Sequence, residues 1–147
     1  NVLGYADANS SEFAPEGQHN VIDLMEEQKS ISNMGGTMRL GAYECQLLPG
    51  SHVAEAYGAT TVSERHRHRF EFNSDFREAF EQGGMKCVGI NPGTGLVEVV
   101  ELPEKRWYIG TQYHPEYQST VLHPNPLFIS FMKAAIDYGR ERRQDNA

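Results

Sequence analysis

The sequence predicts an α/β or α+β domain, and three observations lead to that class. Short apolar or β-branched stretches recur between Pro/Gly turns, and stretches with helical spacing lie among them and at the end of the chain. About six strands and three helices are expected, which is too much helix for an all-β fold. The 147 residues have the length of one domain and are long enough to bury a core.

The chain is expected to begin with irregular structure. Residues 1–20 are polar and rich in turn-forming residues, and residues 21–25 have the character of a short apolar strand. A polar loop over residues 26–34 then leads to a strand over residues 38–48, whose side chains alternate imperfectly in polarity. A Pro-Gly turn ends that strand.

Two short helices are expected in the middle of the chain. Ser51 is a natural N-cap for the first, and Gly58 suits its end because glycine adopts the left-handed conformation easily. A β-branched strand over residues 60–63 follows. Ser74 or Asp75 can cap the second helix, which a pair of glycines closes.

A β-hairpin is expected next. Residues 85–90 and 96–102 are strand-like, and the Pro/Gly turn over residues 91–95 joins them. Residues 107–113 form a further strand before the polar segment that leads to the last helix.

The last element is the clearest helix in the sequence. Asn125 can cap it, and Pro126 fits the first helical position. Residues 1–140 are therefore assigned to one domain, and residues 141–147 to a polar tail that frays from Arg140. The apolar residues at helical spacing are Leu127, Phe128, Phe131, Ala134, Ala135 and Tyr138.

Composition excludes several classes of function. The net charge of −7 argues against binding nucleic acid, because phosphate binding needs a basic surface. No apolar run approaches the roughly 18 residues of a membrane span, so no membrane partner is expected. The chain begins at Asn1 without a signal peptide, which fits a domain fragment of a cytoplasmic protein better than a whole gene product.

The two cysteines, Cys45 and Cys87, lie far apart and form neither a disulfide framework nor a CxxC metal motif. A reducing, cytoplasmic setting is the default for such a pattern. The neighbouring Glu44 would raise the pKa of the Cys45 thiol, and Cys87 sits in an apolar strand, so both are interpreted as structural.

His114 and Glu116 stand two residues apart after an apolar run, with the stiff Pro115 between them. Residues at this spacing share a face when they end a strand. A carboxylate beside an imidazole fixes the tautomer and stabilises the imidazolium, as a Cys–His–carboxylate system requires. From spacing alone, a loop histidine paired with its neighbour is the commoner explanation.

The segment Glu64–Glu71 places three arginines and two histidines between two glutamates. In a strand the arginines would share one face and the histidines the other. Two interpretations stay open: the arginines bind an anion, or they form ion pairs with the flanking glutamates. The arginines are Arg65, Arg67 and Arg69, and the histidines are His66 and His68.

Two further segments are ambiguous by themselves. Glu12 lies in a polar loop, where composition indicates only an exposed acid. Gly35–Gly41 contains adjacent glycines, which usually form a turn and less often an anion-binding nest. A metal site is conceivable but not demanded by spacing, and none is expected. Its ligands would be His66, His68, His114 and Glu116.

Taken together, four segments resemble the glutaminase domain of CTP synthases, a branch of the class I glutamine amidotransferases. They occur in that family's order, and the resemblance extends to about Arg140. It implies an α/β, flavodoxin-like domain that lacks its N-terminal portion, because the family's Gly-x-Cys-x-Gly-x-Gln nucleophile elbow is absent from these residues. The segments are Asn9–Phe13, Gly35–Gly41, Glu64–Glu71 and Gln112–Glu116.

The resemblance implies a role for each matching residue. His114 would be the general acid and base, and Glu116 would orient it. Arg69 would bind the α-carboxylate of L-glutamine, and Glu12 its α-ammonium group. Gly35–Gly41 would face the region where the activator GTP binds.

The resemblance also implies that these residues belong to a larger ligase of pyrimidine biosynthesis. That parent would amidate UTP to CTP with ammonia from glutamine, use ATP and Mg²⁺ in a separate amidoligase domain, and form a homotetramer. The chain alone would hold no cofactor and would be inactive without the nucleophilic cysteine. It would also expose a sheet edge and apolar surface where the missing portion packs.

Three alternatives remain at this stage. One is another class I amidotransferase or a γ-glutamyl hydrolase, which shares the histidine and acid but not the Gly35–Gly41 and Glu64–Glu71 segments. A second is a non-catalytic regulatory relative that has lost its cysteine. A third is a metal-binding module that uses the histidine pairs.

Overall fold

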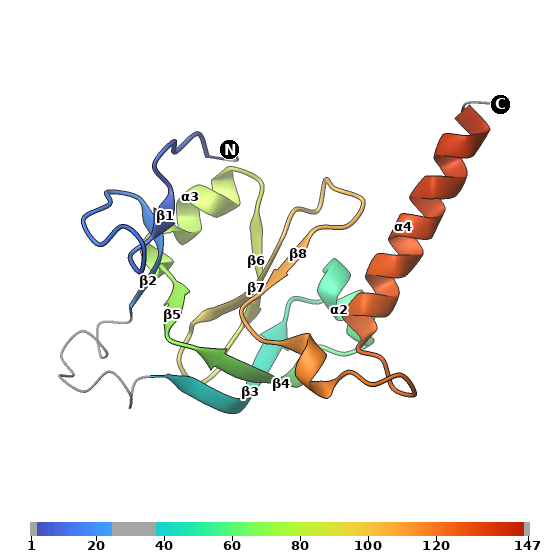
Figure 1. The fold of residues 1–147 in the computed structure, drawn as a ribbon, viewed down its shortest axis with the longest axis horizontal. Coiled ribbons are helices and arrows are strands. Elements are labelled where there is room, and N and C mark those ends of the chain that lie inside the picture. Colours follow the sequence, from blue (N-terminus) through green and yellow to red (C-terminus); the bar gives the residue numbers. More distant parts are fainter. Residues whose placement is uncertain (1–2, 25–37, 146–147) are drawn as a thin grey trace.

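The computed structural model describes residues 3–24 and 38–145. Its larger sheet has five strands, and all neighbouring strands in it are antiparallel (Figure 1). In spatial order these are β4 (Thr61–His68), β3 (Arg39–Leu47), β6 (Lys86–Ile90), β7 (Val97–Glu101) and β8 (Ile109–Thr111).

A smaller, three-stranded sheet lies beside the larger one. Its central strand β2 pairs with β1 in parallel and with β5 in antiparallel orientation. The chain passes from β4 to β5 within two residues, so the two sheets are joined where the arginine-rich segment ends. In spatial order the strands are β1 (Asn9–Ser10), β2 (Asn20–Leu24) and β5 (Phe70–Phe72).

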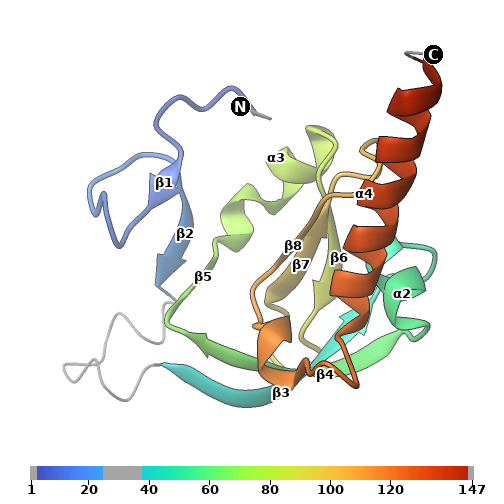
Figure 2. The ribbon, with the colours of Figure 1, turned by 45° about the vertical axis from the view of Figure 1, so that its right-hand side comes forward.

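The helices lie at the periphery of the sheets. Figure 2 shows the long α4 beside the short α2, and α4 then extends away from the strands. The described helices are α2 (His52–Tyr57), α3 (Arg77–Gln82) and α4 (Pro126–Asp145), with single 3₁₀ turns η2 (Ser74–Phe76) and η3 (Pro115–Gln118).

The predicted mixed α/β class and the β6–β7 hairpin are confirmed. Three strand boundaries differ from prediction. Residues 1–20 contain the short β1, β4 continues through the arginine-rich segment instead of stopping at residue 63, and the strand expected over residues 107–113 covers only Ile109–Thr111. The differences arise because pairing partners, rather than local propensity, decide how far a strand extends.

The predicted helix caps are mostly correct. The Ser51 side chain accepts a hydrogen bond from the backbone of Ala54, and Gly58 has the left-handed φ of 64° that ends α2. Asn73, not Ser74 or Asp75, caps η2 ahead of α3. Asn125 accepts from the backbone N–H of Leu127, 3.0 Å away, at the start of α4. That helix continues to Asp145 instead of fraying from residue 140.

The main core lies between the larger sheet and the helices α2 and α4. A second, smaller core joins the sheets near α3, and its buried members are Phe72, Cys87 and Val97. The main core consists of Cys45, Leu47, Val53, Ala54, Val88, Val99, Tyr113 and Leu127. Both α2 and the first turn of α4 contribute buried side chains to this core.

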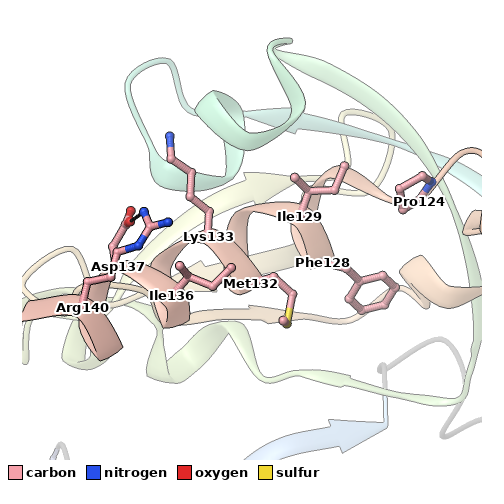
Figure 3. A pocket seen from close by; sticks show the side chains of 8 residues that line it. All are labelled: Pro124, Phe128, Ile129, Met132, Lys133, Ile136, Asp137 and Arg140. Carbon is pink, nitrogen blue, oxygen red and sulfur yellow. Dashed lines mark ion pairs between the residues drawn. The ribbon is translucent and has the colours of Figure 1, made fainter. Parts of the chain in front are cut away.

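The rest of α4 exposes apolar side chains. Leu127 is its only buried residue. Figure 3 shows how the exposed side chains line a pocket along the helix together with Lys133, Asp137 and Arg140. No described helix is both long enough and apolar enough to cross a membrane. The exposed apolar residues of this pocket are Phe128, Ile129, Met132 and Ile136.

Candidate active site

His114 and Glu116 form a hydrogen-bonded pair at the start of η3. His114 Nδ1 lies 2.7 Å from Glu116 Oε1, and the imidazole stacks on the Tyr117 ring with centroids 4.9 Å apart. Partial desolvation raises the pKa of Glu116, but the hydrogen bond with His114, a backbone hydrogen bond and the charge of His114 together outweigh it, so the net pKa is lowered. The pair therefore keeps an ionised carboxylate against one imidazole nitrogen and leaves Nε2 to exchange a proton.

The turn that carries this pair is fastened to β4. The backbone N–H of His114 donates to the carbonyl of Arg65, 2.8 Å away. At the other end of η3, the Gln118 amide donates to the carbonyl of Ser63 at 3.0 Å and to the carboxylate of Glu64 at 3.2 Å. The arginine-rich strand thus binds both ends of the turn that carries the candidate catalytic histidine.

The alternation expected for the arginine-rich segment is present in β4. Arg65 and Arg67 are exposed, and His66 is buried on the opposite face. Arg69 follows the strand, is half-buried, and has a buried Nε without a hydrogen-bond partner in the described residues. An unpaired, partly desolvated guanidinium suits a role in binding a carboxylate.

The ion pairs considered between these arginines and the flanking glutamates are absent from the described residues. Glu64 and Glu71 are buried, and period-two alternation turns Glu64 away from the face that carries Arg65. Glu64 accepts hydrogen bonds from neutral side chains, and Glu71 pairs with Arg39. The alternative of a network between these arginines and these glutamates is therefore wrong.

A different charged cluster lies beneath β4, around Arg39. One of its terminal nitrogens donates to Glu71 at 3.2 Å, and the other donates to Glu98 at 2.8 Å. His66 Nε2 lies 3.6 Å from Glu98, and His66 Nδ1 lies 2.7 Å from His68 Nε2. Arg39 thus links the carboxylates of Glu71 and Glu98. The imidazoles of His66 and His68 form a second connection between the same two carboxylates.

Burial sets the protonation of this cluster. Desolvation, reinforced by the charge of Arg39, lowers the pKa of His66 to about 3 and that of His68 to about 4. Desolvation raises the pKa of Glu71 to about 7 against the opposing pull of Arg39, and it also raises the pKa of Glu98. Both imidazoles are therefore neutral at physiological pH, and the two carboxylates compete for one guanidinium.

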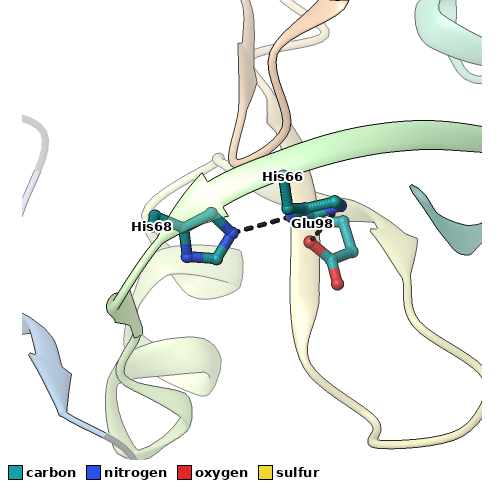
Figure 4. Close-up of side chains that lie close together, drawn as sticks. All are labelled: His66, His68 and Glu98. Carbon is teal, nitrogen blue, oxygen red and sulfur yellow. Dashed lines mark hydrogen bonds and ion pairs between the residues drawn. The ribbon is translucent and has the colours of Figure 1, made fainter. Parts of the chain in front are cut away.

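The donor atoms of His66, His68 and Glu98 lie within 4.8 Å of one another (Figure 4), so the described residues hold one cluster with the composition of a metal site. It does not include His114 or Glu116, which had been considered as ligands with the two histidines. The Arg39 guanidinium already occupies one oxygen of Glu98, which opposes a second cation there. The arrangement fits an internal ion network better than a metal centre.

Sequence reasoning missed Arg39 and Glu98. Glu98 carried a usable signal, because it stands between Val97 and Val99 in a largely apolar strand, where a buried acid needs a partner. Arg39 carried a weaker signal, since it lies within a predicted strand of mixed polarity. The pairing of β3 with β4 sets Arg39 opposite His68, and Glu98 comes from β7, which lies two strands from β3 in the same sheet.

The remaining predicted residues are placed as follows. Glu12 is exposed in the loop after β1, and the described contacts do not join it to Arg69. Gly35, Gly36 and Thr37 lie outside the described residues. The other end of that segment is described, and Leu40 and Gly41 line a pocket with Arg65, Arg67 and Tyr117 beside the His114 turn.

Both cysteines are buried, as their interpretation as structural residues requires. Burial, followed by the charge of Glu98, raises the pKa of the Cys45 thiol to about 12. Burial likewise raises the pKa of Cys87. Neither thiol is suited to act as a nucleophile, because the reactive thiolate is disfavoured in both positions.

Comparison with known proteins agrees with this geometry. Residues 9–134 match the model of the glutamine amidotransferase class-I family. A CTP synthase of Bacteroides fragilis is 69% identical over 137 residues, and one of Porphyromonas gingivalis is 60% identical over 145 residues. These matches cover 93% and 99% of this chain but only 26% of each relative, so the chain spans about a quarter of their length.

A solved structure is also similar over most of the chain. The glutaminase domain of Trypanosoma brucei CTPS, with bound acivicin, has a TM-score of 0.85 and 37% sequence identity. The match covers 93% of this chain and 53% of that one. The fold, the motifs and these similarities together show that the chain belongs to the class I glutamine amidotransferase family and is similar to the glutaminase domain of CTP synthases.

Proposed function

We propose that these residues are the glutaminase portion of a CTP synthase, a cytoplasmic ligase that takes ammonia from L-glutamine to convert UTP to CTP. The single observation that carries the proposal is the His114–Glu116 pair, whose Nδ1 and Oε1 atoms lie 2.7 Å apart at the start of η3, beside the arginine-rich strand. The names of the similar proteins support the choice of CTP synthase within the amidotransferase family.

In the proposed mechanism, a cysteine of the parent protein outside this chain attacks the carboxamide carbon of glutamine. His114 takes the thiol proton and delivers a proton to the departing ammonia. It then activates the water that releases glutamate from the thioester. Glu116 holds Nδ1 throughout, so that Nε2 faces the reaction and the imidazolium is stabilised.

The proposal assigns substrate binding to Arg69 and Glu12. Arg69 offers a half-buried guanidinium with an unpaired Nε, which suits the α-carboxylate of glutamine. Glu12 is the acid proposed for the α-ammonium group. No described contact joins Glu12 to Arg69. Bound substrate, or a further part of the parent protein, would bring the two charges to one ligand.

ATP, UTP and Mg²⁺ are proposed to bind in another part of a homotetrameric parent. Mg²⁺ prefers oxygen ligands, which the His66, His68 and Glu98 cluster does not supply in sufficient number. The pocket that contains Leu40, Arg65 and Arg67 adjoins the segment expected to face the activator GTP. We propose that this chain contacts the GTP-binding region through this pocket.

The test measures glutamate release from glutamine by the full coding product, by its His114→Ala variant and by the 147-residue chain alone. Release is expected from the full product, and at least a hundredfold less, on the order of general-base catalysis, from the variant and the chain. Conversion of UTP to CTP with ATP and ammonium chloride should survive His114→Ala. Release by the isolated chain would refute the missing-nucleophile assignment.

The same assay separates the alternatives. Another class I amidotransferase or a γ-glutamyl hydrolase would release glutamate without response to ATP, UTP or GTP. A non-catalytic regulatory relative would release none in any form. We expect stimulation by the nucleotides, because the Glu64–Glu71 segment resembles CTP synthases in particular.

A further inference from the structure

We propose that Glu64 is a positioning residue of the active site, which sets the place of His114 by holding η3 against β4. The inference rests on the proposed glutaminase function and adds to it a residue that touches neither substrate nor the reacting atoms. It requires that Glu64 be fixed, that η3 be fixed to it, and that a carboxylate be needed at that position.

Glu64 is fixed by a set of converging donors. Its side chain is buried, with only 4% of the residue exposed. One oxygen accepts from the Tyr57 hydroxyl at 2.7 Å and from the Asn125 amide at 2.9 Å. The other accepts from the Gln118 amide at 3.2 Å. These donors come from α2, from the cap of α4 and from the end of η3, so one side chain connects three elements to β4.

The turn that bears the histidine is attached to the same stretch of strand at both ends. His114 is bonded through its backbone to Arg65, the residue after Glu64. Gln118 is bonded to Ser63 and to Glu64. Between these two attachments the turn holds the imidazole and Glu116 in contact. A shift of Gln118 therefore moves the turn and the pair together.

The chemistry at Glu64 requires two acceptors. No ion pair involves this carboxylate in the part of the chain that is described, so its role is not to compensate a cation. Its two oxygens face only N–H and O–H donors. A glutamine would replace one oxygen by an amino group, which would meet one of these donors head on and lose at least one bond. Glu64→Gln therefore changes the hydrogen bonding with almost no change of volume.

The experiment uses the full coding product and compares Glu64→Gln with Glu44→Gln. Glu44 makes a matched control because it lies on the adjacent strand β3, is exposed, and undergoes the same chemical change. For Glu64→Gln we expect kcat for glutamate release to fall about tenfold to a hundredfold, since small displacements of a catalytic group have effects of this size. KM for glutamine should stay within about twofold, because the proposed substrate groups are not among the partners of Glu64. Glu44→Gln should match the wild type in both.

A second pair of variants separates positioning from general destabilisation. Gln118→Met cuts the link to η3 and leaves the other donors of Glu64 in place. Tyr57→Phe cuts the link to α2 and leaves the link to η3 in place. We expect Gln118→Met to lower kcat as Glu64→Gln does, and Tyr57→Phe to lower the melting temperature with kcat nearly unchanged.

The outcomes are distinct. An unchanged kcat in Glu64→Gln, or falls in kcat that simply follow the melting temperature across all three variants, would overturn the positioning role. Absence of glutamate release by the wild-type product would instead refute the proposed function itself. Ammonia-dependent CTP formation, measured in the same preparations, reports whether the amidoligase domain of each variant remains folded, and the melting temperature of the 147-residue chain carrying the same substitution reports on the glutaminase portion.

Discussion

Two regions of this molecule invert the usual distribution of polarity. Beneath β4, an arginine, two glutamates and two histidines are almost wholly buried, whereas α4 exposes a row of large apolar side chains. In the charged region Arg39 pairs with both glutamates. In the apolar region the side chains beyond the first turn of α4 stay largely exposed, although the Phe131 ring contacts Trp107 and Arg106 lies over the Tyr138 ring. The difference shows that whether a group is buried depends on the partners available to it and not only on its hydropathy.

The largest effect is expected from removing the cation of the charged region. Arg39→Met leaves Glu71 and Glu98 buried without their guanidinium, which should lower the free energy of unfolding by about 3–5 kcal/mol. Urea denaturation followed by circular dichroism measures this loss. Arg67→Met, on the exposed face of β4, is the control and should cost less than about 0.5 kcal/mol.

Equal losses for the two arginine variants would contradict the contrast between buried and exposed charge. A further variant sharpens it. Adding Glu71→Gln and Glu98→Gln to Arg39→Met removes both uncompensated carboxylates, so part of the lost stability should return.

The next effect compares two neighbouring residues of α4. Leu127 is 3% exposed in the main core, whereas Ile129 is 54% exposed on the apolar surface. Leu127→Ala should lower the free energy of unfolding of the 147-residue chain by about 2–5 kcal/mol, because it leaves a cavity. Ile129→Ala should change it by less than about 0.5 kcal/mol. Similar losses would mean that the chain covers the helix in solution.

The extent of successful prediction differs between the same two regions. The start of α4 was predictable because Asn125, Pro126 and the apolar spacing act within a few residues of one another. The His114–Glu116 pair was predictable for the same reason, since only Pro115 separates its members. Local patterns of this kind can be interpreted without knowing which distant residues pack together.

The charged region was not predictable in the same way. Arg39, Glu71 and Glu98 are far apart in the sequence, and the cluster forms only because strands β3, β5 and β7 of the two sheets come together. Alternation in Glu64–Glu71 correctly separated arginines from histidines. It could not identify the partners of the flanking acids, because Arg39 for Glu71 and the neutral donors for Glu64 come from other elements.

The pH dependence of stability offers a smaller test of the charged region. Burial raises the pKa of Glu71 from 4.5 to about 7, so its contribution to stability is present below pH 4.5 and is lost as pH rises through 7. Glu71→Gln removes that titration. The unfolding free energy of the wild type minus that of Glu71→Gln should therefore fall as pH rises from 4.5 to 7. Denaturation at several pH values measures the difference.

The groups that face Glu71 are Arg39, His68 and Glu98, and all remain in Glu71→Gln, so their own titrations cancel from the difference to first order. The exposed Glu104 provides a control, since Glu104→Gln makes the same chemical change at a carboxylate that is not buried. If the unfolding free energy of the wild type minus that of Glu71→Gln rose with pH instead, Arg39 would stabilise the ionised Glu71 carboxylate more than burial destabilises it.

The smallest effect on folding is expected from charging the exposed apolar surface. Met132→Lys with Ile136→Lys should change the unfolding free energy of the 147-residue chain by less than about 0.5 kcal/mol, because both side chains are about half exposed. The same pair should reduce self-association of the chain, measured by sedimentation velocity, since lysines remove an apolar patch. The relatives are about four times as long as this chain. If a further part of the full coding product packs on α4, the two lysines should clearly lower its free energy of unfolding. An equally small loss there would mean that no further part of the protein packs on α4, and the inversion of polarity would then be a lasting property of the surface.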